Sequence, residues 1–396
     1  MSMTRRGMLY GSLGAVAVGV TRRPARAAAE PIRLGWLVAL TGANSAFGIG
    51  VNRGVVYAVN KINAAGGING RMIEVITRDT QGDPAKAVNA AVEMASSIKV
   101  HAVFGPTNSG ETLATTPIFA RAKVPSLVVN QVNSLIDPVK FPNAFRMAPY
   151  LTQWDDANRH YILDIMKVKK VAVIGDNTGY GTTATAEAVA AFKKAGADVV
   201  YDAVVDANAQ DLSPYLLRAR AGGAEAVAVW SDSTGMNARM MNARGQLGWD
   251  VVFSGHPALG SGDVLRLLEK PAYWDKVYVI GCKACSFDDK GNLPAPTQAF
   301  VDEVKGKIEL SDTSLYWVMV GVDGVRLVAD AVAKAGSSDP DAIIGYWNHI
   351  TKWPGLYGHY SFTPTDHNGY PTDEIVMSLA SSQKNGCFIP APGYAA

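Results

Sequence analysis

Short apolar runs alternate with longer segments of helical periodicity from residue 32 onward. The apolar runs span residues 32–40, 72–77, 102–104, 126–129, 170–174, 199–205, 224–230, 251–254 and 277–281. Runs that are apolar at nearly every position are typical of strands buried on both faces, as in parallel sheets covered by crossover helices. The pattern therefore predicts an α/β protein built from Rossmann-like, doubly wound sheets.

The predicted strands fall into two series, one ending near residue 147 and one running from residue 151 to residue 281. A chain of 396 residues is also expected to form about two domains. Residues 146–149 are the expected crossing between the two series. A later helix, residues 315–334, carries valines at positions 318, 322, 325 and 332 on one stripe, which predicts that it packs on a sheet.

We expect this later helix to return to the first series. The N-terminal lobe is then expected to hold residues 30–148 and about 284–350, and the C-terminal lobe residues 149–283 and about 351–396. Residues 358–362 and 374–379 are expected to pair as a hairpin beside the hinge, because a turn-forming stretch lies between them.

Residues 1–29 have the three parts of an export signal. Arg5 and Arg6 begin it, an apolar stretch over residues 7–20 follows, and small residues precede Glu30. The apolar stretch is shorter than the roughly 20 residues that a membrane-spanning helix needs. We therefore predict a cleaved signal peptide, with a retained membrane anchor as the alternative. The paired arginines indicate the twin-arginine export route, which predicts a periplasmic protein.

Charge and motifs argue against a nucleic-acid-binding protein and against an enzyme. The formal net charge is +2, and no basic stripe with interleaved aromatic residues occurs. No Walker loop, H-E-x-x-H or G-x-S-x-G motif is present, and the six histidines lack metal-ligand spacing. Gly48, Gly50 and Gly54 follow a strand but miss the dinucleotide-binding spacing by one residue. We therefore expect neither catalysis nor a cofactor.

The sequence contains three cysteines, Cys282, Cys285 and Cys387. A structural zinc site usually needs four ligands, and no second pair accompanies the Cys282-x-x-Cys285 spacing. In an oxidising compartment, a disulfide between Cys387 and either Cys282 or Cys285 is expected. Three free thiols are the alternative.

A series of motifs occurs in a characteristic order. They are Gly35-Trp-Leu-Val-Ala-Leu-Thr-Gly42, Gly48 to Gly54, Asn60-Lys-Ile-Asn-Ala-Ala-Gly-Gly-Ile-Asn-Gly70, Arg78-Asp-Thr80, Gly105-Pro-Thr-Asn-Ser109, Phe145-Arg146 and Gly175-Asp-Asn-Thr-Gly-Tyr-Gly181. The ordered set resembles the type I periplasmic binding fold, and within it the leucine/isoleucine/valine-binding family of ABC importers. The resemblance covers nearly all of the chain after residue 30. It implies two lobes joined by three crossings that close over a ligand.

In open α/β sheets, the ligand site lies beyond the carboxyl ends of the strands. Thr107, Asn108 and Ser109 leave a short strand and enter a helix, so they are candidates to hold a carboxylate at the helix N-terminus. The alternative is that one of these side chains only caps its own helix. The resemblance implies that Asn130 and Gln131 face the same carboxylate.

Further candidates line the expected cleft. Ser45 and Phe47, in the first strand-to-helix turn, are expected to reach over it. The second lobe is expected to contribute Tyr150, Trp154, Tyr180, Trp230, Asp232 and His256. Aromatic side chains suit a cleft that closes on an apolar ligand body, and ordinary core packing is the alternative role for them.

One position departs from the family pattern. In amino-acid binders of this family, an acidic residue after the strand that corresponds to residues 251–254 holds the ligand ammonium, whereas this sequence has Gly255-His256-Pro257. Asp232 is a candidate to replace that acid, because a buried charge needs a partner. Otherwise the ligand is a carboxylate without an amine.

We therefore expect a monomeric, periplasmic, non-catalytic component of an ABC importer. It would bind a small carboxylate-bearing solute of the branched-chain amino acid class and pass it to a membrane permease. An aromatic carboxylic acid or amide is the alternative ligand. A ligand-sensing module of a membrane receptor is an alternative of another class, because one fold can serve several functions.

Overall fold

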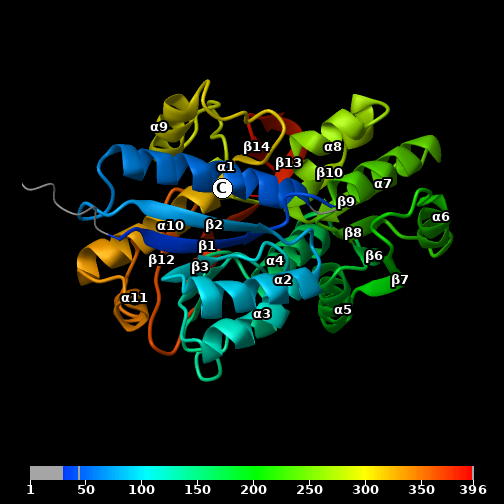
Figure 1. Ribbon diagram of the computed structural model, residues 1–396. Coiled ribbons are helices and arrows are strands. Elements are labelled where there is room, and N and C mark those ends of the chain that lie inside the picture. Colours follow the sequence, from blue (N-terminus) through cyan, green and yellow to red (C-terminus); the bar gives the residue numbers. More distant parts are fainter. Residues whose placement is uncertain (1–29, 43–44, 395–396) are drawn as a thin grey trace, which may run out of the picture.

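The computed structural model describes residues 30–42 and 45–394, so the expected export signal lies outside the described residues. The first sheet has five parallel strands in the order β2-β1-β3-β4-β5 (Figure 1). Its strands are β1 (Ile32–Val38), β2 (Ile73–Asp79), β3 (Ala102–Phe104), β4 (Ser126–Val128) and β5 (Ala144–Arg146). Its helices are α1 (Ser45–Ala64), α2 (Pro84–Val92), α3 (Ser109–Arg121), α10 (Leu315–Ala335) and α11 (Pro340–Trp347).

Alternation along β1 explains why both faces of this sheet are covered. Leu34 and Trp36 belong to one apolar core with α1 and α10, whereas Leu37 belongs to another with α2 and α3. Successive strand residues point to opposite faces of the sheet. A strand with apolar residues on both faces must therefore be covered by helices on both faces. The first lobe is therefore a three-layer α/β/α unit, with α1 above the sheet and α3 below it in Figure 1.

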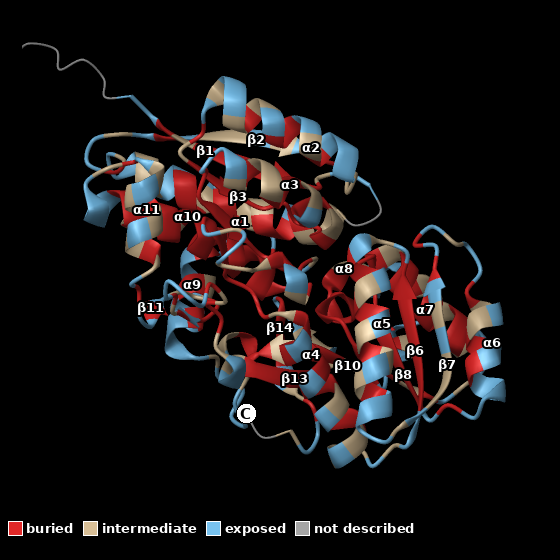
Figure 2. Ribbon diagram, turned by 90° about the horizontal axis from the view of Figure 1, so that it is seen from below, coloured by how far each residue is buried: buried red, intermediate tan, exposed pale blue. Residues whose placement is uncertain are grey.

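The second sheet has seven strands in the order β14-β13-β10-β9-β8-β6-β7. Its strands are β6 (Lys170–Asp176), β7 (Asp198–Val205), β8 (Ala226–Trp230), β9 (Val252–Gly255), β10 (Val277–Cys282), β13 (Ile375–Lys384) and β14 (Cys387–Pro390). The helices of this lobe are α4 (Leu151–Arg159), α5 (Gly179–Lys194), α6 (Ser213–Ala221), α7 (Thr234–Gln246) and α8 (Gly262–Leu267). Figure 2 shows buried elements inside each lobe, with exposed helix faces around them. The prediction of a two-lobed α/β protein is confirmed.

Three segments cross between the lobes. The first joins β5 to α4, at residues 146–151, where the sequence predicts a crossing near residues 146–149. The second follows β10 and leads through α9 (Ala295–Val304) to α10, which packs against α1 as predicted for the returning helix. The third contains the short 3₁₀ helix Thr372–Glu374 and leads into β13.

The predicted hairpin between residues 358–362 and 374–379 is wrong. β12 (His359–Tyr360) pairs with β11 (Trp353–Pro354), and β13 pairs with β10 and β14. Two short apolar runs around a turn satisfy the sequence rule for a hairpin, but each run here finds its partner in a different lobe.

The expected lobe boundary near residue 350 also differs from the contacts. The buried Asp323 carboxylate on α10 accepts hydrogen bonds from the backbone N–H of Leu356 (2.8 Å) and Tyr357 (2.9 Å) and from the hydroxyl of Tyr360 (3.1 Å). Burial outweighs these bonds and raises the pKa of Asp323 to about 6. His367 stacks on Phe145 of β5, so the chain stays on the first lobe to about residue 370.

Direct backbone contact between α1 and α10 holds the returning segment on the first lobe. A Cβ at Gly54 would overlap the carbonyl oxygen of Val318, and a Cβ at Gly321 would overlap that of Val51. Gly48 and Gly50 are also packed too closely for a side chain. The glycine spacing that nearly matches a dinucleotide-binding motif is thus explained by close packing of α1.

Replacing Gly321 with alanine should destabilise the protein despite the higher helix propensity of alanine. The added methyl group has no room beside Val51, and such overpacking typically costs about 1–3 kcal/mol. Gly345→Ala on α11 is the matched control, because no atom lies within 4 Å of its Cβ position and alanine should add up to about 1 kcal/mol. Urea denaturation measures both free energies, and equal stability of the two variants would contradict this packing.

Candidate functional site

A small cavity lies between the two lobes, at the carboxyl ends of both sets of parallel strands. The space in it that can hold the centre of a water molecule is about 20 Å³. Its lining residues are Phe47, Thr107, Ser109, Asn130, Gln131, Trp154, Tyr180, Asp232, His256 and Tyr316. Both lobes contribute to this lining, so the two lobes lie in a closed arrangement.

Nine of the predicted site residues are in that lining, and four are not. Ser45 begins α1, and Asn108 caps α3. Tyr150 precedes α4, where Arg146 lies 5.9 Å from the centre of its ring. Trp230 is fully buried in the same apolar core as Ala226 and Ala228, so its side chain packs on the face of the second sheet.

The turn from β3 into α3 offers hydroxyl groups to the cavity. The Thr107 Oγ1 atom accepts a hydrogen bond from the backbone N–H of Ala39 (3.0 Å), which leaves its own proton to donate. Ser109 is 1% exposed, and its hydroxyl is a buried group without a hydrogen-bond partner in the described part of the chain. Because buried polar groups are usually satisfied, this hydroxyl indicates a place for a ligand atom or a water molecule.

The loop after β4 brings amide groups to the same side of the cavity. The Oδ1 atom of Asn130 accepts from the hydroxyl of Thr112 (2.7 Å), and the Nε2 atom of Gln131 donates to the carbonyl of Val129 (2.8 Å). Arg146 fixes this loop by donating to the carbonyls of Gln131 (3.4 Å) and Val132 (2.7 Å). Burial lowers the pKa of Arg146 to about 9.

The second lobe contributes a buried acidic group. Asp232 follows β8 and is 9% exposed, and its backbone N–H donates to Asp176 at the end of β6 (3.2 Å). The Nδ2 atom of Asn108 donates to the Asp232 carboxylate across the lobe interface (3.3 Å). Burial, and then the neighbouring Asp176, raise the pKa of Asp232 well above its usual range.

His256 stands in the cavity as a neutral ring. Its Nδ1 atom accepts from the backbone N–H of Ala258 (3.1 Å), so the remaining proton is on Nε2. Burial lowers the pKa of His256 to about 3. Its ring centre lies 5.3 Å from that of Trp154 and 5.1 Å from that of Tyr180. The Tyr180 hydroxyl is buried without a partner in the described part of the chain.

Sequence reasoning missed Tyr316, which lies in the first turn of α10 and stacks on Tyr357 with ring centres 5.3 Å apart. The valine stripe of its helix predicts packing on a sheet, and the tyrosine follows neither a strand nor a recognisable turn in the sequence. It also missed Asp176, which lies within the Gly175 to Gly181 motif. The signal available for Asp176 was its position at the end of an apolar strand.

The lobes touch through two glycines beside the cavity. A Cβ at Gly179, in the first turn of α5, would lie 2.7 Å from the Cα atom of Gly110, in the first turn of α3. Neither glycine has a positive φ angle, so close approach of the two backbones is the constraint here. This contact and the Asn108–Asp232 hydrogen bond define the closed arrangement.

The predicted disulfide is not formed in the structure, where Cys282, Cys285 and Cys387 are all free and buried. The Sγ atom of Cys285 lies 3.5 Å from the sulfur of Met319, and its thiol contacts the other two cysteines. Burial raises the pKa of the Cys285 thiol. Within the described residues, no group of three or more His, Cys, Asp or Glu side chains has the arrangement of a metal site.

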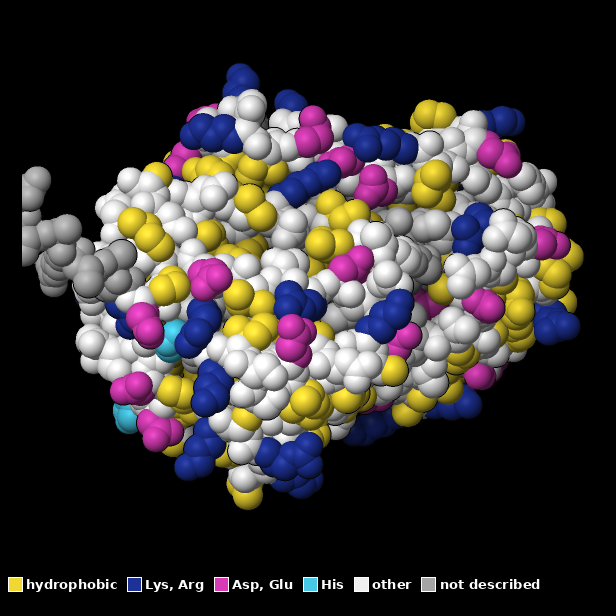
Figure 3. Space-filling view, viewed as in Figure 1, with side chains coloured by type: hydrophobic (Ala, Val, Ile, Leu, Met, Phe, Trp, Pro, Cys, Tyr) yellow, Lys and Arg dark blue, Asp and Glu magenta, His cyan; other side chains and the backbone are white. Residues whose placement is uncertain are grey.

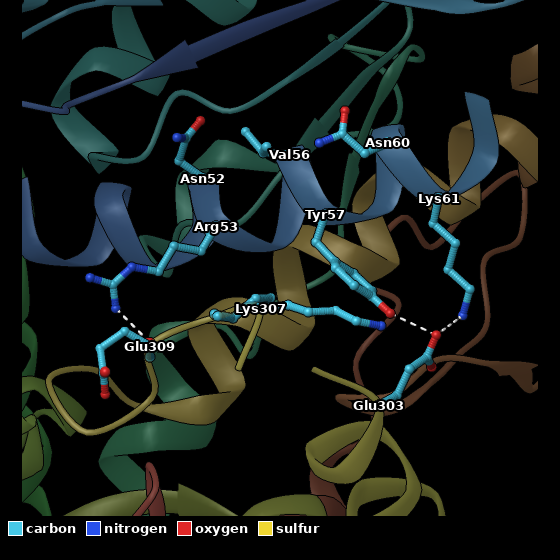
Figure 4. A pocket seen from close by; sticks show the side chains of 10 residues that line it. Asn52, Arg53, Val56, Tyr57, Asn60, Lys61, Glu303, Lys307 and Glu309 are labelled. Carbon is cyan, nitrogen blue, oxygen red and sulfur yellow. Dashed lines mark hydrogen bonds and ion pairs between the residues drawn. The ribbon is translucent and has the colours of Figure 1, made fainter. Parts of the chain in front are cut away.

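An open groove on the outer surface, between α1 and residues 303–309, is a weaker candidate (Figure 4). Its charged groups largely satisfy one another, since Glu303 accepts from Tyr57 (2.6 Å) and pairs with Lys61. Arg53 donates to the carbonyl of Glu309 (2.8 Å). Lysine, arginine and acidic side chains are interspersed on the face that Figure 3 shows. The enclosed cavity, with its unpartnered buried hydroxyls, is therefore the better candidate site.

Comparison with known proteins gives a family match over almost the whole chain. The family model described as a periplasmic binding protein matches residues 31–382. The amino acid binding protein of Pseudomonas aeruginosa is 32% identical over 188 residues, which are 47% of this chain and 50% of that protein. The chain thus spans half the length of this curated relative. Leu/Ile/Val-binding protein homolog 1 of Brucella abortus is 26% identical over 84% of this chain and 86% of that protein.

Two solved structures share the fold. The branched-chain amino acid transporter substrate binding protein LivJ of Streptococcus pneumoniae, in complex with isoleucine, has a TM-score of 0.77 and 23% identity over 90% of this chain and 97% of its own. A solute binding protein of an ABC transporter from Rhodopseudomonas palustris, in complex with 3,4-dihydroxybenzoic acid, has a TM-score of 0.73 and 22% identity. The match covers 88% of this chain and 92% of that chain. These likenesses confirm the predicted type I periplasmic binding fold. None of the helices in residues 30–42 and 45–394 is both long and apolar enough to span a bilayer.

Proposed function

We propose that this chain, which belongs to the periplasmic binding protein family, is the solute-binding component of an ABC importer. It holds a small carboxylate-bearing solute of the branched-chain amino acid class between its lobes, in the periplasm. The observation that carries the proposal is the enclosed cavity, which both lobes line and which has hydroxyl groups on one side and a buried acid on the other. The space open to a water-sized molecule, about 20 Å³, is far below the roughly 300–1,000 Å³ that ligand pockets occupy, as expected for lobes closed on an empty site.

The first-lobe side suits a carboxylate. Thr107 and Ser109 present hydroxyl protons at the start of α3, a helix of 13 residues whose N-terminus carries partial positive charge. A carboxylate here would give the unpartnered Ser109 hydroxyl an acceptor. Hydrogen bonds to charged groups are worth about 1.5–3 kcal/mol, so this side supports substantial affinity.

The second-lobe side suits an ammonium group. The buried Asp232 carboxyl group lines the cavity together with Tyr180 and His256. A buried carboxylate needs a positive partner or a proton. The relatives named as Leu/Ile/Val-binding proteins, and LivJ with bound isoleucine, support an amino acid with an apolar side chain.

An aromatic carboxylic acid is the second candidate. Phe47, Trp154, Tyr180 and Tyr316 supply four rings around the cavity, and the Nε2 proton of His256 can donate to a ring substituent. The Rhodopseudomonas palustris relative that holds 3,4-dihydroxybenzoic acid supports this class.

Binding coupled to lobe closure is the proposed mechanism. With so little space open to water in the closed arrangement, a solute enters only when the lobes separate. Contacts from both lobes then favour the closed form, and a permease that recognises this form receives the solute. No bond of the solute is made or broken.

Ser109→Ala should weaken solute binding about tenfold or more without lowering stability. The hydroxyl has no partner in the described part of the chain to lose when the cavity is empty, but it would lose a charge-assisted bond to the carboxylate when the cavity is filled. Isothermal titration calorimetry with L-isoleucine and 3,4-dihydroxybenzoate measures affinity, and urea denaturation measures stability. Thr182→Ala on the exposed face of α5 is the control, and unchanged affinity of Ser109→Ala would remove this role.

Asp232→Asn should separate the two ligand classes. An amide cannot neutralise an ammonium, so affinity for leucine, isoleucine, valine and phenylalanine should fall at least 100-fold. Aromatic acids without an amine should bind within a few-fold of wild type. The measurement is the shift in melting temperature of wild type and Asp232→Asn with each amino acid and each amine-free aromatic acid. A ligand that binds only the folded state raises the melting temperature of the protein. Equal losses for both classes would rule out Asp232 as the ammonium partner.

Gly179→Ala should impair closure while leaving each lobe intact. The added methyl group would meet the Cα atom of Gly110 only when the lobes are together. We expect affinity for L-isoleucine to fall at least tenfold, with a larger radius of gyration than wild type at saturating ligand in small-angle X-ray scattering. Gly345→Ala, whose methyl group meets nothing, is the control. Closure and affinity equal to those of wild type would show that this contact does not limit closing.

A further inference from the structure

Two polar groups on the second-lobe side of the cavity have no hydrogen-bond partner in the described part of the chain. The first is the hydroxyl of Tyr180, a residue that lines the cavity and is 2% exposed. The second is the Nε2–H group of His256, because the hydrogen bond of this ring is made by Nδ1. Buried polar groups are usually satisfied, so two unused groups beside one cavity indicate a place for a ligand atom.

The surrounding backbone orients both rings. Tyr180 lies in the first turn of α5, a helix capped by Thr178. The backbone N–H of His256 donates to the carbonyl of Val229 (3.0 Å), and its Nδ1 atom accepts from the backbone N–H of Ala258 (3.1 Å). The ring centres of Tyr180 and His256 are 5.1 Å apart. The two unused groups therefore lie close enough to meet the same small group of a ligand.

Together, these two groups require a ligand atom that can accept a hydrogen bond. The Nε2–H group of His256 only donates, whereas the hydroxyl of Tyr180 donates or accepts. A hydroxyl oxygen of the ligand satisfies both. An ammonium group has donors only, and an alkyl side chain leaves both groups buried without a partner. An unsatisfied buried donor loses its hydration without compensation, so the closed form favours a ligand with an oxygen at this position.

The carboxylate candidates and the two unused groups belong to different lobes. Thr107 and Ser109 follow β3 in the first lobe, whereas Tyr180 and His256 follow strands of the second. The apolar part of the lining consists of the aromatic side chains of Phe47, Trp154 and Tyr316, which suit an aromatic ligand body. A ligand with a carboxylate, an aromatic ring and a further oxygen would meet both lobes, so the further oxygen would also favour lobe closure.

We propose that Tyr180 and His256 form an oxygen-binding subsite and that the solute is an aromatic carboxylic acid with a ring hydroxyl. This inference rests on the proposed function and selects the second of its two candidate ligand classes. The ring hydroxyl accepts a hydrogen bond from the Nε2–H group of His256 and donates to the oxygen of Tyr180. Thr107 and Ser109 hold the carboxylate. Tyr180 and His256 then determine specificity, because they distinguish a hydroxyl group from a methyl group of similar size.

Matched pairs of ligands test the subsite on the wild-type protein. 4-Hydroxybenzoate and 4-methylbenzoate have nearly the same shape, but only the first can hydrogen-bond at the end remote from the carboxylate. 3-Hydroxybenzoate and 3-methylbenzoate give the same comparison at the neighbouring ring position. In isothermal titration calorimetry, we expect the hydroxyl compound of at least one pair to bind at least tenfold more tightly than its methyl partner. Sites built to hydrogen-bond a ligand hydroxyl discriminate strongly against an analogue that lacks it.

The outcomes separate this inference from the proposed function. If the acids bind with no preference for the hydroxyl in either pair, the subsite is wrong and carboxylate binding between the lobes stands. If L-isoleucine binds and the four acids do not, the subsite is again wrong and the amino-acid class stands. If neither L-isoleucine nor any of the four acids binds, the proposed function fails together with the subsite.

Two variants test the residues themselves. Tyr180→Phe removes the unpartnered hydroxyl and keeps the ring, so the preference for hydroxyl over methyl should fall about tenfold, with unchanged stability in urea denaturation. His256→Asn removes the Nε2–H group and keeps an acceptor for the backbone N–H of Ala258, and it should lower the preference similarly. Tyr215→Phe on α6, outside the cavity lining, is the matched control. An unchanged preference in either variant would remove that residue from the subsite.

Discussion

Parallel strands end at one edge of their sheet, and the whole candidate site depends on this constraint. Each strand in a doubly wound sheet must be followed by a turn into a crossover helix, so the turns gather where the strands end. Both lobes bring that edge to the same place. Thr107 and Ser109 after β3, Asn130 after β4, Asp232 after β8 and His256 after β9 are neighbours for this reason, although they are far apart in the sequence.

When the lobes close, the residues of these turns become a buried site. Groups that water would satisfy in an open cleft lose that water when Gly110 and Gly179 meet. The hydroxyls of Ser109 and Tyr180 are left buried without partners in the described part of the chain, which is unfavourable unless a ligand or water fills the space. A closed lobe arrangement that is costly when empty and favourable when filled is the physical basis of ligand-dependent closing.

The sequence predicts most of the fold and the turns that form the site, for identifiable reasons. Continuous apolar runs specify buried parallel strands, and most of the candidates chosen after such runs line the cavity between the lobes. The predictions that were wrong depend on contacts between segments that are distant in the sequence. The strands near residues 359 and 375 pair in different lobes, which no local rule reveals. Trp230 belongs with Ala226 and Ala228 on one face of β8, and strict alternation along that strand identifies it as a core residue.

The position of the buried acid carries the specificity argument further. The family pattern places an acidic residue after the strand that corresponds to β9, where this chain has His256, whereas Asp232 follows β8, its neighbour in the sheet. Adjacent strands are about 4.8 Å apart, so an acidic side chain is still present at the same edge of the sheet, one strand away. The backbone N–H of Asp232 donates to Asp176, the last residue of the next strand β6, and the neutral ring of His256 follows β9. The polar groups on the second-lobe side thus come from two neighbouring strand ends, an acidic group after β8 and a neutral ring after β9.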